Sequence, residues 1–316
     1  MSCASKHDDV AKVRARRPRR IVLIRHGQSL GNVDETEYTR TPDSRVALTT
    51  LGQEQARGAG AALAKLLQSD PGDVKKRSNL FVYSSPYTRC QQTLEHVLLG
   101  ANIAPESLIG NVQEPRLREQ DFGNFQDATS MAQSKDERQR FGRFYYRFPQ
   151  GESGADVYDR VSTWLESLFR QMTFGDIDQD TTLLIVTHGL TARLFLMRWF
   201  HWTVDEFEAS YNPPNGQLLI MERGDLSGRG SVGYQLTADT RVAMGLGGES
   251  STVLVETLGH GGASGELDQP LSPMDRKVRR DSQFANLNSV ADALNLSGSP
   301  RQGTDRGRGG KKDSLW

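Results

Sequence analysis

The chain has 316 residues, and its 39 basic and 39 acidic side chains balance, so the net charge does not point to a nucleic acid or a membrane surface as partner. Two cysteines exclude a disulfide framework and a zinc site built mainly from thiolates. The apolar runs are far shorter than the ~18 residues that a membrane span requires.

The two ends differ in composition from the middle of the chain. Residues 1–19 are short, polar and basic, and residues 241–316 are dominated by Gly, Ser, Asp, Arg and Asn. Such composition cannot bury a core, so we expect both ends to be disordered and one domain to span 20–240. Transit peptides also have basic N-terminal segments, but Asp8 and Asp9 argue against import into an organelle. We therefore expect a cytoplasmic protein.

Strands and helices alternate along the middle of the chain. In chain order, strands are predicted at 21–24, 80–83, 182–187 and 216–221, the last at an edge, and helices at 49–67, 87–99, 157–172 and 190–200. The first three strands are continuously apolar, which is typical of buried parallel strands. This pattern predicts an α/β protein, a three-layer α/β/α sandwich with a mostly parallel central sheet. Cys90 falls on the apolar face of its helix, where we expect a buried thiol.

Polar side chains gather just after the predicted strands. Arg25 and His26 follow the first strand, Ser84 and Arg89 follow the second, and His188 follows the third. Ligands of open parallel sheets bind at the carboxyl ends of the strands, so we expect these side chains to form one site.

Arginines and histidines in one site suit phosphoryl transfer. One guanidinium group can bind two phosphate oxygens at once, and its positive charge stabilises the negative charge of the transition state. A neutral imidazole can attack phosphorus and carry it covalently, and nearby arginines keep the imidazole neutral by repulsion. The leaving alkoxide needs a proton, which a carboxyl group of the charged stretch 118–121 can supply.

The same residues carry a family resemblance. Segment 25–32, with the sequence RHGQSLGN, resembles the RHG signature of the histidine phosphatase superfamily, the phosphoglycerate mutase-like proteins. Segments 48–56, 84–93, 151–153 and 186–189 resemble further motifs of that family in the same order. The resemblance spans roughly residues 20–223 and implies His26 as the phosphorylated nucleophile, with Arg25, Arg89 and His188 around the phosphoryl group.

The resemblance also implies a proton donor and further substrate contacts. Glu119, in a stretch that resembles the family's acid segment, is the expected donor and later the base that activates water, although Glu114 and Asp121 lie close to it. No metal and no cofactor are expected, because arginines and histidines already supply the charge stabilisation. The expected substrate-binding residues are Asn32, Ser29 and Gly189.

The length of the insert after Glu119 distinguishes between two activities. Twenty-nine residues separate Glu119 from Pro149, and this insert resembles the shorter one of the family's phosphatases. Segment 33–46 lacks the tryptophan that the family's mutases carry there. We therefore favour a phosphatase that acts on small phosphomonoesters, with phosphoglycerate mutase activity as the alternative. The basic and aromatic residues of 138–147 either contact a polyanionic or ring-bearing substrate or form the solvated side of a lid helix.

A third hypothesis is a binding platform that recruits a protein partner through its tail. Arg279 and Arg280 precede Ser282, so a phosphate there would meet two guanidinium groups. The Gly-Arg runs near the end could contact RNA weakly, but a nucleic-acid partner is not favoured. The complete catalytic set argues for an enzyme.

Overall fold

The computed structural model describes residues 17–68, 79–123, 128–175, 177–226 and 231–246. The strands are β1 Arg20–Arg25, β2 Asn79–Ser84, β3 Leu108–Gln113, β4 Thr181–Thr187, β5 Leu218–Leu226 and β6 Ser231–Leu236. The helices are α2 Leu30–Val33, α3 Glu37–Arg40, α4 Thr50–Gln68, α5 Thr88–Ala101, α6 Ala128–Phe141, α7 Gly154–Phe174, α8 Gly189–Phe200, α9 Val204–Ala209 and α10 Ala238–Ala243, with single 3-10 turns η1 Asp43–Arg45, η2 Pro105–Ser107 and η3 Pro115–Leu117.

The central sheet has the strand order β3-β2-β4-β1-β5-β6. The strands from β3 to β1 run parallel, β5 is antiparallel to β1, and β6 is antiparallel to β5. Parallel neighbours need a long crossover between them, which the helices provide. The sheet is mostly parallel, as the sequence predicts.

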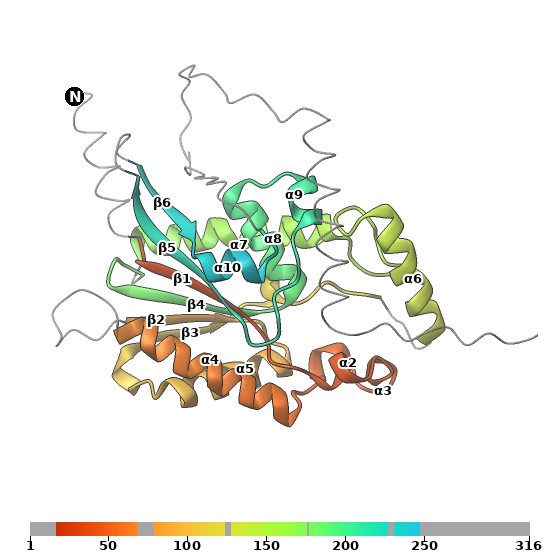
Figure 1. Ribbon diagram of the computed structural model, residues 1–316, viewed down its shortest axis with the longest axis horizontal. Helices are drawn as coiled ribbons and strands as arrows, with labels where there is room; N and C mark the ends of the chain where they lie inside the picture. The colour runs from red at the N-terminus through yellow and green to blue at the C-terminus, as the bar shows by residue number, and fades with distance from the viewer. Residues whose placement is uncertain (1–16, 69–78, 124–127, 176, 227–230, 247–316) are drawn as a thin grey trace, which may run out of the picture. The chain divides into compact units, whose positions relative to one another are not determined.

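Helices cover both faces of the sheet. In β1, Ile21 and Leu23 pack in the core that α7 and α8 share with the sheet, whereas Val22 and Ile24 pack against α4 and α5. Successive side chains of a strand point to opposite faces, so a continuously apolar strand fills two cores at once. Figure 1 shows α4 and α5 on one side of the sheet and α7 and α8 on the other. The three-layer sandwich is confirmed.

Helix α7 illustrates how local sequence sets this packing. The Ser153 hydroxyl accepts a hydrogen bond from the Asp156 N–H, and the Asp156 carboxylate accepts one from the Ser153 N–H at 2.7 Å, which fixes the helix start. The predicted apolar stripe faces the sheet, with Phe169 only partly buried. Its fully buried members are Val157, Val161, Trp164, Leu165, Leu168 and Met172.

The sequence pattern does not reveal β3, β6 or α10. Strand β3 lies at an edge of the sheet, has four exposed and two partly buried residues, and holds no apolar run. The last predicted strand, 216–221, corresponds to β5, which lies inside the sheet because β6 pairs with it; its placement at the edge was wrong.

The described part extends beyond the expected domain limits at both sides. Helix α10 crosses residue 240, and Met244 behind it is fully buried. At the other end, the Arg223 N–H donates to the carbonyl of Arg19 at 2.9 Å. Residues 1–16 and 247–316, which hold most of both predicted disordered ends, lie outside the described residues.

Candidate active site

The candidate catalytic side chains follow three neighbouring strands of the sheet. The hydrogen bonds between β1 and β4 and between β2 and β4 continue one residue beyond β1 and β2. The His26 N–H donates to Thr187 O at 3.0 Å, and the Ser85 N–H donates to Val186 O at 2.9 Å. His188 comes directly after β4 and is the N-cap of α8. Because β2, β4 and β1 are adjacent and parallel, their carboxyl ends bring these residues to one edge, as expected.

The ring of His26 is held with one nitrogen turned toward its own backbone. Nδ1 lies 2.7 Å from the carbonyl oxygen of Gly27. A carbonyl oxygen only accepts hydrogen bonds, so we assign the ring proton to Nδ1, which leaves the lone pair on Nε2. The rings of His26 and His188 meet edge to face with centroids 5.2 Å apart. The arrangement leaves the lone pair of His26 Nε2 available for a nucleophilic attack.

Both imidazoles are kept neutral. His26 is 4% exposed and His188 is fully buried. Burial, and next the positive charge of Arg89, lowers the pKa of each ring well below its usual value. The Gly27 hydrogen bond opposes the shift of the His26 pKa, and Arg25 adds to it. A neutral ring can attack an electrophile at ordinary pH.

His188 is fixed by the segment that follows β2. Its Nε2 lies 2.8 Å from the Ser85 hydroxyl and 3.4 Å from Sγ of Cys90, and its ring meets that of Tyr87 edge to face at 5.2 Å. Cys90 is fully buried, as predicted, and burial raises the pKa of its thiol to about 12. The thiol is therefore a packing partner of His188 rather than a nucleophile.

Each active-site arginine is anchored through one terminal nitrogen. Nη1 of Arg25 donates to the carbonyl of Pro213 at 2.7 Å. Nη1 of Arg89 donates to Asp43 twice, at 2.6 Å to the carbonyl oxygen and at 2.8 Å to Oδ1. Among the described residues, the buried Nε of each arginine has no hydrogen-bond partner. The anchors fix both guanidinium groups and leave donors available for phosphate oxygens.

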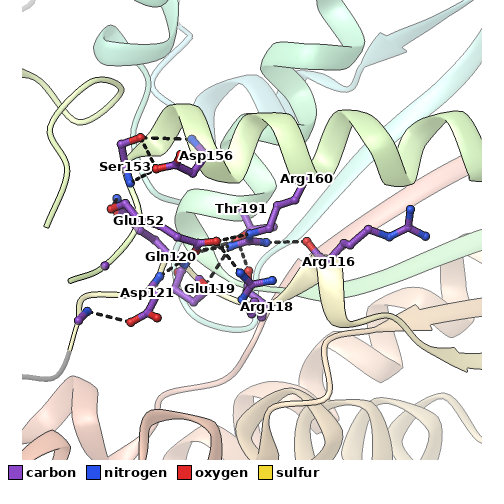
Figure 2. Close-up of polar contacts among 12 residues, drawn as sticks. Arg116, Arg118, Glu119, Gln120, Asp121, Glu152, Ser153, Asp156, Arg160 and Thr191 are labelled. Atoms are coloured by element: carbon purple, nitrogen blue, oxygen red, sulfur yellow. Dashed lines mark hydrogen bonds and ion pairs between the residues drawn. The ribbon is translucent and has the colours of Figure 1, made fainter. Parts of the chain in front are cut away.

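Glu119 lies next to Thr191, a residue in the first turn of α8 (Figure 2). The hydroxyl of Thr191 is 2.8 Å from the Arg118 carbonyl and 3.1 Å from Oε1 of Glu119. Oε1 also accepts a hydrogen bond from the Gln120 N–H at 3.1 Å. The Glu119 carboxylate also interacts electrostatically with Arg25, on which it acts to raise the pKa. The expected acid is therefore close enough to influence the expected phosphate-binding arginine.

A partly buried ion-pair network holds the backbone around Glu119 (Figure 2). Arg160, from α7, donates to the carbonyls of Arg116 at 2.6 Å and Glu119 at 3.0 Å. It also binds both carboxylate oxygens of Glu152, at 3.0 and 3.1 Å, and Arg118 binds the same carboxylate at 2.5 Å. Helix α7 thereby sets the position of the acid segment.

The expected substrate-binding residues occupy different positions. Asn32 is exposed, and its Oδ1 accepts hydrogen bonds from the backbone and hydroxyl of Ser29, both at 3.1 Å, and from Asn215 at 3.2 Å. Asn215 also donates to the carbonyl of His26 at 3.0 Å, which ties Asn32 to the backbone of the candidate nucleophile. Ser29 is fully buried, so its visible role is to hold Asn32. Gly189 begins α8 and packs against Asn212.

Several residues that shape the site are not found by sequence reasoning. Ser85 and Thr191 lie within or beside the recognised motifs, so closer attention to hydroxyl groups there would have found them. Arg160 carries a signal too, because an arginine inside an amphipathic helix needs an acidic partner. Asp43 begins the 3-10 turn η1 and Asn215 lies in the loop before β5, and no sequence pattern marks either residue.

A pocket of about 350 Å³ adjoins Arg89 through Asp43. Two chain segments and one residue of α6 form its wall. They are Tyr38, Thr39, Arg40, Thr41, Pro42, Asp43, Asp121, Phe122, Gly123 and Met131.

Comparison with known proteins identifies the family. The model of the histidine phosphatase superfamily, branch 1, matches residues 21–229, which is more than half of the chain. The chain belongs to the histidine phosphatase superfamily. The phosphoglycerate mutase-like protein AT74 of Arabidopsis thaliana is 44% identical over 73% of this chain and 73% of its own length. The broad-range acid phosphatase DET1 of Saccharomyces cerevisiae is 34% identical over 65% of this chain and 86% of its own.

Solved structures agree with this fold. The protein titled Mycobacterial hydrolase 1 has a TM-score of 0.51 and 22% identity, and the match covers 69% of this chain and 97% of that one. The resemblance to the family is thus confirmed, and so is the histidine phosphatase fold.

Two further properties concern the described residues of this family member. No group of three or more His, Cys, Asp or Glu side chains there is placed to hold a metal ion. In the same part of the chain, no helix combines the length and apolar character needed to cross a membrane.

Proposed function

We propose that the protein is a phosphomonoester phosphatase that works through a phosphohistidine on Nε2 of His26. The observation that carries the proposal is the state of this ring: Nδ1 is bound to the Gly27 carbonyl, and burial and Arg89 keep the ring neutral. The family membership supports the same reaction class.

In the first step, Nε2 of His26 attacks phosphorus and the bond from phosphorus to the alcohol oxygen breaks. Arg25 and Arg89 bind the non-bridging oxygens with the donors that their anchors leave unused. Glu119 transfers its proton to the departing oxygen, so the alcohol leaves uncharged. In the second step, the Glu119 carboxylate accepts a proton from water, the water oxygen attacks phosphorus, and the bond to Nε2 breaks.

The test compares His26→Asn with His201→Asn, a matched change at an exposed histidine outside the site. Turnover of a phosphomonoester panel that includes 2- and 3-phosphoglycerate is measured in EDTA, together with trapping of an acid-labile phosphoenzyme. We expect phosphate release and phosphoenzyme in wild type and His201→Asn, and neither in His26→Asn. Isomerisation of phosphoglycerate without phosphate release would make the protein a mutase, and loss of wild-type turnover in EDTA would contradict the metal-independent mechanism.

Two finer expectations belong to the same proposal. We expect the protein in the cytoplasm, which fractionation of cells expressing the full chain tests. The tail is proposed to recruit a protein partner, and its residues from 247 onward lie outside the described part. Since Met244 is buried in the domain, the informative deletion removes 247–316 and leaves α10 intact. Unchanged partners and kinetics after this deletion would remove the motivation for a recruiting tail.

A further inference from the structure

Asp43 belongs both to the phosphoryl site and to the 350 Å³ pocket beside it. Its Oδ1 and its carbonyl oxygen accept the two hydrogen bonds of Arg89 Nη1. Among the described residues, no hydrogen bond is made to its second carboxylate oxygen, Oδ2. The side chain is 27% exposed, so it is partly withdrawn from solvent while it lines the pocket. A molecule in the pocket therefore lies beside Asp43.

The pocket wall carries more negative than positive charge. Asp43 and Asp121 contribute two carboxylates, and Arg40 contributes one guanidinium group. Arg40 is exposed, where water and salt screen its charge, and it also interacts with Asp34 outside the pocket. Beyond the wall, Arg89 and Glu119 act on Asp43 in opposite directions, and the charge of Arg89 is already paired with Asp43. Anionic groups are disfavoured in such a pocket, whereas hydroxyl groups find acceptors.

We propose that this pocket receives the alcohol part of the substrate, and that Asp43 selects phosphate esters of uncharged, hydroxyl-bearing alcohols over esters whose alcohol carries a carboxylate. The inference rests on the proposed phosphatase function. A leaving alcohol must sit next to the phosphoryl group it departs from, and the pocket begins at the residue that anchors Arg89. Oδ2 of Asp43 accepts a hydrogen bond from a hydroxyl group and repels a carboxylate.

The selection depends on the charge of Asp43. Burial raises the pKa of its carboxyl, Glu119 and Asp121 act in the same direction, and Arg89 opposes them. Tyr38 and Tyr87 also face it, and burial raises the pKa of each phenol, so both remain neutral. As the pH falls, Asp43 gains a proton at a higher pH than an ordinary aspartate does. The discrimination against carboxylates then weakens.

The test uses two esters that differ at one position. Glycerol 3-phosphate has a hydroxymethyl group where 3-phosphoglycerate has a carboxylate. The readout is the ratio of their kcat/KM values. The amount of active enzyme cancels in this ratio, and so does proton donation by Glu119, because both esters release an alcohol. We expect wild type to prefer glycerol 3-phosphate by about tenfold or more, and Asp43→Asn to reduce that ratio by about tenfold. Asp136→Asn, at an exposed position on α6, is the matched control and leaves the ratio unchanged.

A pH arm needs no variant. Between about pH 7 and about pH 4 the wild-type ratio falls because Asp43 gains a proton, and a constant wild-type ratio would overturn the selection. This arm remains decisive even where Asp43→Asn fails to fold.

The outcomes separate the inference from the proposed function. An equal ratio in wild type and Asp43→Asn, or equal losses for both esters, would mean that Asp43 only anchors Arg89 and would overturn the selection. Absence of turnover of any ester by wild type would refute the phosphatase instead. In that case calorimetric binding of the two esters to wild type and to Asp43→Asn gives the same ratio without chemistry, and equal ratios would again reject the role of Asp43.

Discussion

Replacing Arg160 by Met removes the group that holds the acid segment. The guanidinium makes four hydrogen bonds, two to the Glu152 carboxylate and one each to the carbonyls of Arg116 and Glu119. Its side chain is 10% exposed, so water replaces few of these contacts. Met keeps the apolar stem of arginine and deletes every donor, so the variant isolates the polar contribution.

The magnitude follows from what the variant leaves behind. Removal of one partner from a buried ion pair costs about 3–5 kcal/mol, and an unpaired buried polar group costs about 1–3 kcal/mol. Arg118 still compensates Glu152, which lowers the first cost. We therefore expect the free energy of unfolding to fall by about 3 kcal/mol. The control, Arg118→Met, removes one bond from a side chain that is 36% exposed and should cost less than about 1 kcal/mol.

Urea denaturation measures the loss of unfolding free energy in both variants. The effect on Glu119 is measured by comparing kcat/KM for esters with different leaving groups. An alkyl phosphate needs a proton on its leaving oxygen, whereas p-nitrophenyl phosphate releases a stable anion. In Arg160→Met the kcat/KM for the alkyl ester should fall more than that for the aryl ester. Equal stability losses in the two variants would refute the burial argument. Equal kinetic losses on the two esters would refute the positioning of Glu119.

Three further predictions concern backbone fit, protonation and the buried thiol. Gly27→Ala should unfold more easily and lose activity, because the new Cβ would lie 2.2 Å from the Gly52 carbonyl oxygen. In the control, Gly58→Ala, the new Cβ has nothing within 4 Å, and urea denaturation should show a free energy of unfolding higher by roughly 0.5–1 kcal/mol. The folded state lowers the pKa of His26 and His188, so the unfolded chain binds the extra protons and stability falls as the pH drops below about 6.5, by up to about 1.4 kcal/mol per unit for each ring. His26→Asn should reduce this slope by the share of one ring, and identical slopes would contradict the reasoning. In a chain whose other cysteine is Ser, Cys90 should react with a thiol reagent only on unfolding, and fast labelling of the folded enzyme would show that it is accessible.

The main strands and helices could be predicted from the sequence because burial imposes regular patterns. The run 21–24 is apolar at every position because β1 lies between two cores. The stripe on α7 repeats at helical spacing because one face packs on the sheet. Strand β3 escapes prediction, since an edge strand with largely exposed residues needs no apolar run.

The same contrast holds for the site. Histidines and arginines after strands are visible in the sequence, because parallel strands bring their carboxyl ends to one edge whatever the loops do. The anchors are not visible: Asp43 lies 46 residues before Arg89, and Pro213 lies 188 residues after Arg25. Their contacts depend on where irregular segments cross the edge of the sheet, and no local pattern encodes that path.

The sequence by itself therefore determined the fold class, the family resemblance and the identity of the candidate nucleophile, since these depend on periodic burial and on motifs of contiguous residues. Only the tertiary structure decided which nitrogen of His26 is free, which groups hold the arginines, and that Asp43 stands between the phosphoryl site and the pocket. Those properties arise from hydrogen bonds between distant segments and from loss of water on folding, and neither exists until the chain has folded.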